Sequence, residues 1–315
     1  MIAIVIHERG GPEQFVCEQV PDPRPKKGEV LVRVHAAGVT PTELTWETTY
    51  RTRDGASRLP SIPGHELSGV VQVAADGSNF ATGDAVYGLI DFWRNGDFAE
   101  FVTVAANDLA PKPQNVDHEH AAAAAMSALA AWQALFDYAA LAEGHRILIH
   151  GAAGGVGSFA VQFAHWCGAH VLATAAAKHR EFVLDLGAHE VIDYTAQRFE
   201  DVVHDVDVVL DLIGGDTLTR SWGVLQPGGI LITLAGTIDL SEASRRRVRG
   251  VRFTVKPSRT DLAAIARLID AGTIRSIVSD VFPLACAQKA FRQGLMGHNR
   301  GKIVLRVEGG HSGRG

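Results

Sequence analysis

Short runs of alternating hydrophobic and polar residues, separated by Gly, Pro and Asp, fill the first third of the chain. Such runs predict strands that begin and end at turns. They cover residues 1–6, 30–35, 67–73, 84–88 and 99–104. Many short strands with turn residues between them are typical of a barrel or a sandwich. We therefore expect a barrel-like β domain over residues 1–117.

The hydrophobic pattern changes character at residue 118. Residues 118–141 are rich in Ala and have a helical composition. Buried strands that alternate with helices follow, and they predict an α/β domain with a doubly wound parallel sheet, the Rossmann arrangement, over residues 118–260. The expected strands of this sheet are 146–150, 170–174, 191–193, 206–211 and 229–234.

The last part of the chain, residues 261–315, mixes the two patterns. We expect amphipathic helices near 262–271 and 285–295, and a closing strand at 302–307. The Gly-rich end, residues 308–315, is expected to be disordered.

Length, charge and cysteine content narrow the class of protein. A chain of 315 residues is long enough for two domains. The net charge of -5 gives no reason to expect nucleic-acid binding. No apolar stretch reaches the roughly 18 residues of a membrane helix, and the first residues lack the basic leader of a signal peptide. Cys17, Cys167 and Cys286 are too widely spaced for a disulfide framework and favour a reducing cytoplasm.

The strongest chemical signal lies where the strand at 146–150 meets the next helix. The segment from Gly151 to Gly157 reads Gly-Ala-Ala-Gly-Gly-Val-Gly. Small residues let the backbone approach a pyrophosphate, and the helix N-terminus offers N–H groups and a positive dipole end. A strand, this turn and a helix together predict a dinucleotide site. Its expected residues are Ala152, Ala153, Gly154, Gly155, Val156 and Gly157.

The next strand indicates which dinucleotide binds. An NAD site usually places Asp or Glu at the end of that strand, where the carboxylate binds the ribose hydroxyl. Here Thr174 is followed by alanines, and Lys178 and Arg180 come next. A carboxylate would repel a 2′-phosphate, whereas Lys and Arg attract it. We therefore predict NADPH as the cofactor, with Thr174, Lys178 and Arg180 in its site.

Several segments in a fixed order resemble the medium-chain dehydrogenase/reductase superfamily, in its zinc-free quinone oxidoreductase (zeta-crystallin-like) branch. The resemblance covers nearly the whole chain. The segments that carry it are Ala36–Pro41, Pro63–Val71, Gly83–Gly88, Gly151–Gly157, Leu186–Ala188, Val191–Tyr194, Pro227–Gly229 and Gly301–Leu305.

The resemblance implies a GroES-like catalytic domain followed by a Rossmann domain. It implies that the C-terminal segment returns to the first domain, that the active site lies in the cleft between the two, and that the chain forms a homodimer. The positions that it adds to the cofactor site are Tyr194 beside the 2′-phosphate, Leu212, Leu234 and Ala235 beside the nicotinamide, and Asn299 and Lys302 near the cofactor cleft.

The zinc-binding pattern of related dehydrogenases is incomplete in this chain. Zinc sites in this fold use Cys or His ligands in the catalytic domain. His65 and Glu66 match one part of the pattern, but Thr40 stands at the thiolate position, and residues 126–131 contain neither Cys nor His. The few cysteines also cannot supply a cysteine-rich structural lobe. We therefore expect no zinc.

Without a Lewis acid, the natural reaction is hydride transfer to an acceptor that is already electrophilic, a quinone or an α,β-unsaturated carbonyl. Thr40, Tyr50 and His65 are the candidate catalytic groups on the acceptor side. The branch often has Asn where Thr40 stands, and a Thr within the segment that here is Leu129–Ala131. The candidates for an aromatic wall beside a flat acceptor are Trp46, Tyr50, Phe92 and Trp93.

Two alternatives stay open. The same residues suit an enone or enoyl-thioester reductase of a biosynthetic pathway, because nothing in them separates these acceptors from quinones. The chain could also be an NADPH-binding sensor or structural protein with little turnover.

Overall fold

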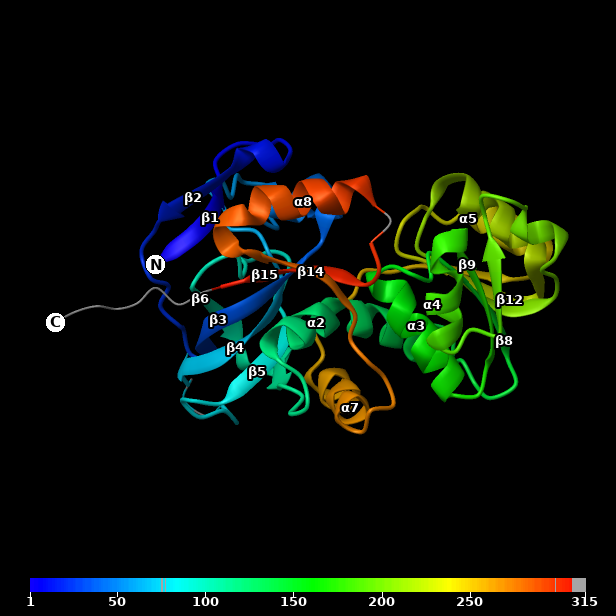
Figure 1. Cartoon of the computed structure of the whole chain (residues 1–315). Helices are drawn as coiled ribbons and strands as arrows, with labels where there is room; N and C mark the ends of the chain where they lie inside the picture. The colour runs from blue at the N-terminus through cyan, green and yellow to red at the C-terminus, as the bar shows by residue number, and fades with distance from the viewer. Residues whose placement is uncertain (75, 77, 298, 308–315) are drawn as a thin grey trace. The chain divides into compact units, whose positions relative to one another are not determined.

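The structure, a computed structural model, describes residues 1–74, 76, 78–297 and 299–307. The tail that we expect to be disordered, residues 308–315, lies outside the described residues. The chain forms two compact units (Figure 1). Unit 1 contains Met1–Met126, Lys256–Gly272 and the chain from Ser276 onward, and unit 2 contains Ser127–Val255 and Thr273–Arg275. The division between the two units falls inside helix α2 (His118–Trp132), whereas the sequence placed the boundary at residue 118, where this helix begins.

Unit 1 is built on an antiparallel sheet, and among its described strands only the pair β14–β15 is parallel. Within the described part of the chain its strand order is β14-β15-β3-β4-β5-β7, and β6 pairs with β3. Its strands are β3 (Glu29–Val39), β4 (Glu66–Val73), β5 (Ala85–Leu89), β6 (Phe101–Ala105), β7 (Leu109–Pro111), β14 (Val278–Pro283) and β15 (Lys302–Arg306). Strands β1 (Ile2–Ile6) and β2 (Phe15–Gln19) form a separate antiparallel pair.

The core of unit 1 follows from the alternation that the sequence showed. Val30, Val32 and Val34 of β3 are buried, and the residues between them are partly exposed. They pack in one hydrophobic cluster with Phe98 and Phe291. The helices of this unit are α1 (Glu47–Tyr50), α7 (Arg259–Asp270) and α8 (Ala287–Met296).

The last strand of the described chain, β15, lies beside β3. The register pairs Ile303 with Val39 and Val304 with Gly38. Because the pairing is antiparallel, Lys302 at the start of β15 lies next to Thr40, which follows the end of β3. Residues far apart in the sequence are thus brought together by strand register alone.

Unit 2 is a parallel sheet with the strand order β10-β9-β8-β11-β12-β13 over the described residues. The order reverses direction between β8 and β11, and open α/β sheets bind ligands at the carboxyl ends of the strands at such a point. The α/β fold class expected from the sequence is confirmed. The strands are β8 (Arg146–His150), β9 (His170–Ala175), β10 (Glu190–Asp193), β11 (Val206–Asp211), β12 (Leu225–Thr233) and β13 (Arg249–Arg252). The helices are α3 (Gly155–Trp166), α4 (Arg180–Asp185), α5 (Gly215–Ser221) and α6 (Leu240–Arg246), and a π-helical turn spans Gln133–Tyr138.

Strand β13 was not expected from the sequence. It pairs with β12 at the edge of the sheet, with Ile230 opposite Arg249 and Thr233 opposite Arg252. The sequence gave no signal for β13, because its four residues include two arginines and form no apolar run.

In the described part of the chain, no helix combines the length and the apolar character that crossing a membrane requires.

Candidate active site

The loop between β8 and α3 has the geometry of a phosphate-binding turn. A Cβ atom at Gly157 would lie 2.2 Å from the carbonyl oxygen of Gly151 and 2.8 Å from Cα of Ala152, so the helix packs here directly against the loop. A Cβ at Gly154 would meet only the Gly151 oxygen, at 3.4 Å. The space beside Gly154 is therefore open. The N-terminal amides of α3 begin at this point, and such amides lack partners inside the helix.

The residues expected around the 2′-phosphate lie at the ends of β9 and β10. Lys178 and Arg180 are exposed, and Tyr194 is 52% exposed. The Arg180 guanidinium donates to the carbonyl oxygen of Val191, at 2.7 Å, which directs it along β10. All three residues follow β9 or β10, which lie at one edge of the sheet of unit 2.

An acid that the sequence did not assign to this edge is Asp193. It lies opposite Ala175 in the parallel register of β10 and β9. Its carboxylate accepts from the hydroxyl of Thr195 at 2.7 Å and from the Thr195 amide at 3.0 Å. These bonds lower the pKa of Asp193, and the Ala177 amide adds to them. The end of β9 carries no acid of its own, but its neighbour strand supplies one.

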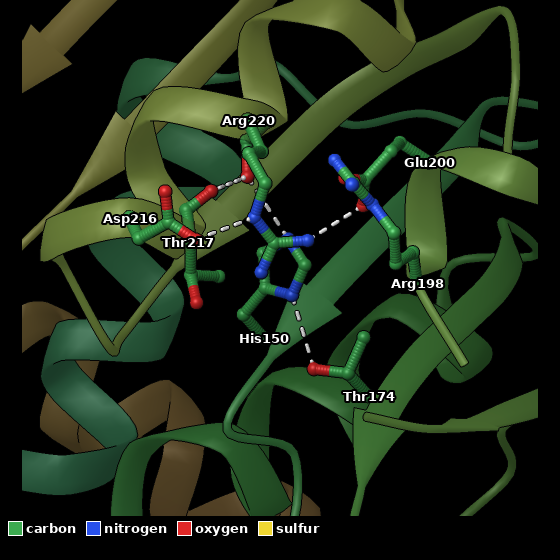
Figure 2. A network of polar contacts seen from close by, with 8 residues as sticks. His150, Thr174, Arg198, Glu200, Asp216, Thr217 and Arg220 are labelled. Atoms are coloured by element: carbon green, nitrogen blue, oxygen red, sulfur yellow. Dashed lines mark hydrogen bonds and ion pairs between the residues drawn. The ribbon is translucent and has the colours of Figure 1, made fainter. Parts of the chain in front are cut away.

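A buried polar network fixes the ends of β8 and β9 (Figure 2). His150 Nδ1 lies 3.0 Å from Thr174 Oγ1, and His150 Nε2 lies 3.0 Å from Ser221 Oγ on α5. The Ser221 hydroxyl donates to the carbonyl oxygen of Thr217 at 2.7 Å. Because that proton is used, Nε2–H donates to Ser221 and Nδ1 accepts from Thr174. The network holds β8, β9 and α5 together directly before the phosphate loop.

The outer part of this network carries charge. Arg220 bonds Glu200 at 2.6 Å and Asp216 at 2.8 Å (Figure 2). Its guanidinium lies 4.8 Å from the ring centroid of Phe199, and that ring is 4.5 Å from His150. Burial lowers the pKa of His150 to about 3, and Arg220 adds to the effect. His150 is therefore neutral, with both ring nitrogens bonded, and we interpret it as a support for the loop.

The loops after β11 and β12 are tied by Asp211. Its buried carboxylate accepts from the Gly214 amide at 3.0 Å and from the Thr233 hydroxyl at 2.9 Å. These bonds fix the backbone that follows at the carboxyl ends of both strands. The residues expected there are Leu212 and Leu234, which are half-buried, and Ala235, which is exposed.

Unit 1 contains a buried polar cluster, which we call the Lys302 cluster, made of Thr40, Glu66 and Lys302. The Lys302 ammonium lies 2.8 Å from Thr40 Oγ1 and 2.5 Å from Glu66 Oε1. The Thr40 hydroxyl donates to the same Glu66 oxygen at 2.6 Å. The side chains of Lys302 and Glu66 are 9% and 1% exposed. Asn299, also expected near the cofactor, is half-buried shortly before β15.

Gly38 makes room for this cluster. A Cβ at Gly38 would lie 2.9 Å from Cβ and Cδ of Glu66. The carboxylate of Glu66 can therefore cross β3 and reach Lys302 only because position 38 has no side chain. The sequence identified Thr40 and Lys302 separately, and strand register joins them.

His65 and two further acids lie near this cluster. His65 Nε2 is 3.3 Å from Glu43 Oε1, which also accepts from the Gly64 amide at 2.9 Å. Asp97 approaches Gly64 from another direction, so that a Cβ there would lie 2.1 Å from Asp97 Oδ1. Both oxygens of Asp97 are buried without hydrogen-bond partners, as are Nδ1 of His65 and Oε2 of Glu66. The sequence gave no sign of Glu43 or Asp97, because neither lies in a motif and their burial is tertiary.

The charge state of Asp97 follows from this environment. Burial raises its pKa well above the ordinary range, and the negative charges of Glu43 and Glu66 raise it further, while Lys302 opposes them. Asp97 is therefore harder to ionise than an ordinary aspartic acid.

The aromatic residues divide into separate groups. Trp46 and Phe92 are in edge contact at 5.1 Å, and the Phe92 ring lies 5.1 Å from the His65 ring. Tyr50 instead belongs to the hydrophobic core, and its hydroxyl donates to the carbonyl oxygen of Leu44 at 2.8 Å. Trp93 is 36% exposed and lies under Arg53.

The residues at the position where related dehydrogenases would bind zinc do not fit a zinc ion. Thr40 and Glu66 already share the Lys302 ammonium, and a divalent cation at the same oxygens would be repelled by it. Within the described ranges, no group of three or more His, Cys, Asp or Glu is placed so that it could hold a metal ion. The phosphate loop, in contrast, fits a dinucleotide, because Gly154 leaves open space at a helix N-terminus.

Two family models match parts of the chain. The family model described as alcohol dehydrogenase GroES-like domain matches residues 26–114, and the one described as zinc-binding dehydrogenase matches residues 186–305. The chain is 33% identical over 304 residues to the "Probable zinc-binding oxidoreductase, mitochondrial" of Arthroderma benhamiae, with 91% of each chain covered.

Solved structures are similar over nearly the whole chain. The quinone oxidoreductase from Coxiella burnetii has a TM-score of 0.91 at 28% identity, covering 98% of this chain and 99% of that one. The Escherichia coli quinone oxidoreductase, complexed with NADPH, has a TM-score of 0.87 at 25% identity, covering 97% of this chain and 100% of that one. The resemblance seen in the sequence is thereby confirmed. The chain belongs to the medium-chain dehydrogenase/reductase superfamily, as an oxidoreductase whose relatives include quinone oxidoreductases.

Proposed function

We propose that the protein transfers hydride from NADPH to a quinone or an α,β-unsaturated carbonyl without zinc. The observation that carries the proposal is the loop from Gly151 to Gly157, where Gly157 has no room for a side chain and Gly154 has open space. That arrangement suits a backbone against a pyrophosphate, which is the part of the cofactor common to NADH and NADPH.

The choice of NADPH is supported by the exposed cations at one edge of unit 2. We propose that Lys178 and Arg180 face the 2′-phosphate, with Tyr194 beside the adenosine. The NADPH bound by the Escherichia coli relative supports the same choice. When bound, NADPH supplies the hydride, and the protein positions it and excludes water.

The unit that carries the Lys302 cluster is the proposed acceptor side. Thr40 and His65 lie in or near that cluster, so we keep both as candidate acceptor groups. Tyr50 is a weaker candidate, because its hydroxyl is buried and bonded to a backbone carbonyl. The zinc-free reaction is supported by the donor set, in which an ammonium stands beside Thr40 and Glu66.

Domain ranges, assembly and location are also part of the proposal. We propose a catalytic domain over 1–117 to which 261–315 returns, a cofactor domain over 118–260, and a homodimer. A cytoplasmic location rests only on the three cysteines, which are free. Light scattering after size-exclusion chromatography measures the assembly directly.

A panel of acceptors tests the function. We expect the purified protein to consume NADPH with small quinones or activated enones, followed by the absorbance of reduced nicotinamide. Simple secondary alcohols should not be oxidised with NADP⁺, and chelators should leave the rate unchanged. Preference for enoyl thioesters would identify the reductase alternative. Tight NADPH binding without turnover on any acceptor would identify a sensor or structural protein.

A further inference from the structure

Two of the three acceptor-side candidates, Thr40 and Tyr50, use their protons in hydrogen bonds inside the protein. The Thr40 hydroxyl donates to Glu66, and the Tyr50 hydroxyl donates to Leu44. His65 places Nε2 close to the Glu43 carboxylate, which favours the tautomer with its proton on Nε2 and leaves Nδ1 as an acceptor. Thr40 and Tyr50 cannot donate to an acceptor oxygen without losing a hydrogen bond that they already make.

Lys302 is different, because an ammonium carries three N–H donors. Two of them are used, by Thr40 Oγ1 and by Glu66 Oε1. No hydrogen-bond partner for the third is found within the described ranges. The cluster also contains an unpartnered buried oxygen of Glu66, and His65 Nδ1 nearby is unpartnered too. Both of these atoms accept hydrogen bonds, so the group that could bind a carbonyl oxygen here is the third N–H of Lys302.

The position of the ammonium is fixed from several sides. Register places Lys302 beside Thr40, and Gly38 lets Glu66 reach across β3. Long lysine side chains lose much rotamer freedom when they are held, so an ammonium fixed in advance costs no further ordering when a ligand binds. A prearranged cation in a site with little water is the kind of group that stabilises a developing negative charge most strongly.

We propose that Lys302 binds the oxygen of the acceptor and stabilises the negative charge that develops there, with Thr40 and Glu66 as positioning residues. This proposal rests on the proposed function. As hydride reaches the acceptor carbon, the displaced π-electron pair moves to the oxygen, which then takes a proton from Lys302 Nζ or from water. Water restores the proton, and the sum is acceptor, NADPH and H⁺ giving reduced acceptor and NADP⁺.

Lys302→Met tests the assignment, because it keeps the length of the side chain and removes the charge. We expect kcat on the best enone to fall by a factor on the order of ten to a thousand. The Kd for NADPH, from fluorescence titration, should stay close to the wild-type value. A wild-type kcat in this variant contradicts the assignment, and so does a loss confined to NADPH binding, which would make Lys302 a cofactor contact.

Chemical rescue separates catalysis from packing. In Lys302→Ala, added propylamine should restore part of kcat, whereas propanol, of similar size and without charge, should not. Equal rescue by both, or by neither, contradicts the assignment and indicates a purely structural lysine. Glu66→Gln and Gly38→Ala displace the ammonium without removing it, so both should lower kcat, and less than Lys302→Met does.

Lys112→Met is the matched control. Lys112 is another partly buried lysine of unit 1, and its ammonium donates to the carbonyl oxygens of Pro113 and Val116, away from the cluster. Its kcat should equal the wild-type value. A wild-type protein that binds NADPH and reduces no acceptor contradicts the proposed function. Wild-type turnover that survives in Lys302→Met contradicts only the assignment of Lys302.

Discussion

Asp193 of β10 lies directly opposite Ala175 of β9, and its carboxylate is held there by Thr195. In many NAD sites the acid that binds the ribose stands at the end of the strand that here is β9. This protein has alanines in that place and a carboxylate on the neighbouring strand. A lowered pKa keeps Asp193 ionised at neutral pH. A negative charge at this edge opposes the attraction that Lys178 and Arg180 exert on a 2′-phosphate.

Asp193→Asn should therefore raise the selectivity for NADPH over NADH. The amide keeps a hydrogen-bonding oxygen for Thr195 and removes the charge. We expect the ratio of the two Kd values, measured by titration at low salt, to shift several-fold toward NADPH, and less at high salt. Asp201→Asn, an exposed acid on the same unit, is the control. An unchanged ratio would show that Asp193 lies too far from the phosphate to matter.

The two glycines of the phosphate loop should respond differently to alanine. At Gly157 the new Cβ would collide with backbone atoms, so Gly157→Ala should lower the melting temperature. At Gly154 it fits the protein, so Gly154→Ala should melt like wild type and bind NADPH more weakly, by a factor on the order of ten or about 1.4 kcal/mol. Wild-type NADPH affinity in Gly154→Ala would mean that the pyrophosphate lies elsewhere.

His150 should make stability fall in acid. Its pKa is lowered from 6.5 to about 3, so below pH 6.5 the unfolded chain binds a proton that the folded chain does not. The stability that this provides is present above pH 6.5 and is lost as the pH falls toward 3, by about 1.4 kcal/mol per pH unit. Urea unfolding between pH 7.5 and about 4.5 measures the slope. His150→Asn should make the slope shallower, while the exposed His204→Asn should leave it unchanged.

Asp97 should make stability fall as the pH rises, which is the opposite of the effect of His150. Its raised pKa means that the unfolded chain releases a proton at a pH where the folded chain still holds it. Its contribution is therefore fully present below the ordinary value of 3.8 and declines as the pH rises toward the raised pKa. Asp97→Asn cannot ionise, so its stability relative to wild type should increase with pH in urea unfolding. A constant difference at every pH would show that Asp97 has an ordinary pKa.

The dinucleotide loop and the α/β sheet were determined by sequence alone, because both depend on local order. Strand β8 was expected at 146–150 and spans Arg146–His150, and helix α3 begins at Gly155 as its first glycines indicated. Neighbouring residues carry all the information for a strand, a tight turn and a helix N-terminus. Strand β13 was not predicted because its four residues, Arg249–Arg252, contain no apolar run.

The Lys302 cluster was decided only by the tertiary structure. Its members come from the end of β3, the start of β4 and the start of β15, and nothing in their local sequences states that they meet. Strand register also places Asp193 opposite β9, and the fold buries Asp97 beside Gly64. Strand pairing and burial join residues that are far apart along the chain. The charge states and free donors that follow from such contacts exist only after folding, since desolvation and hydrogen bonding set them.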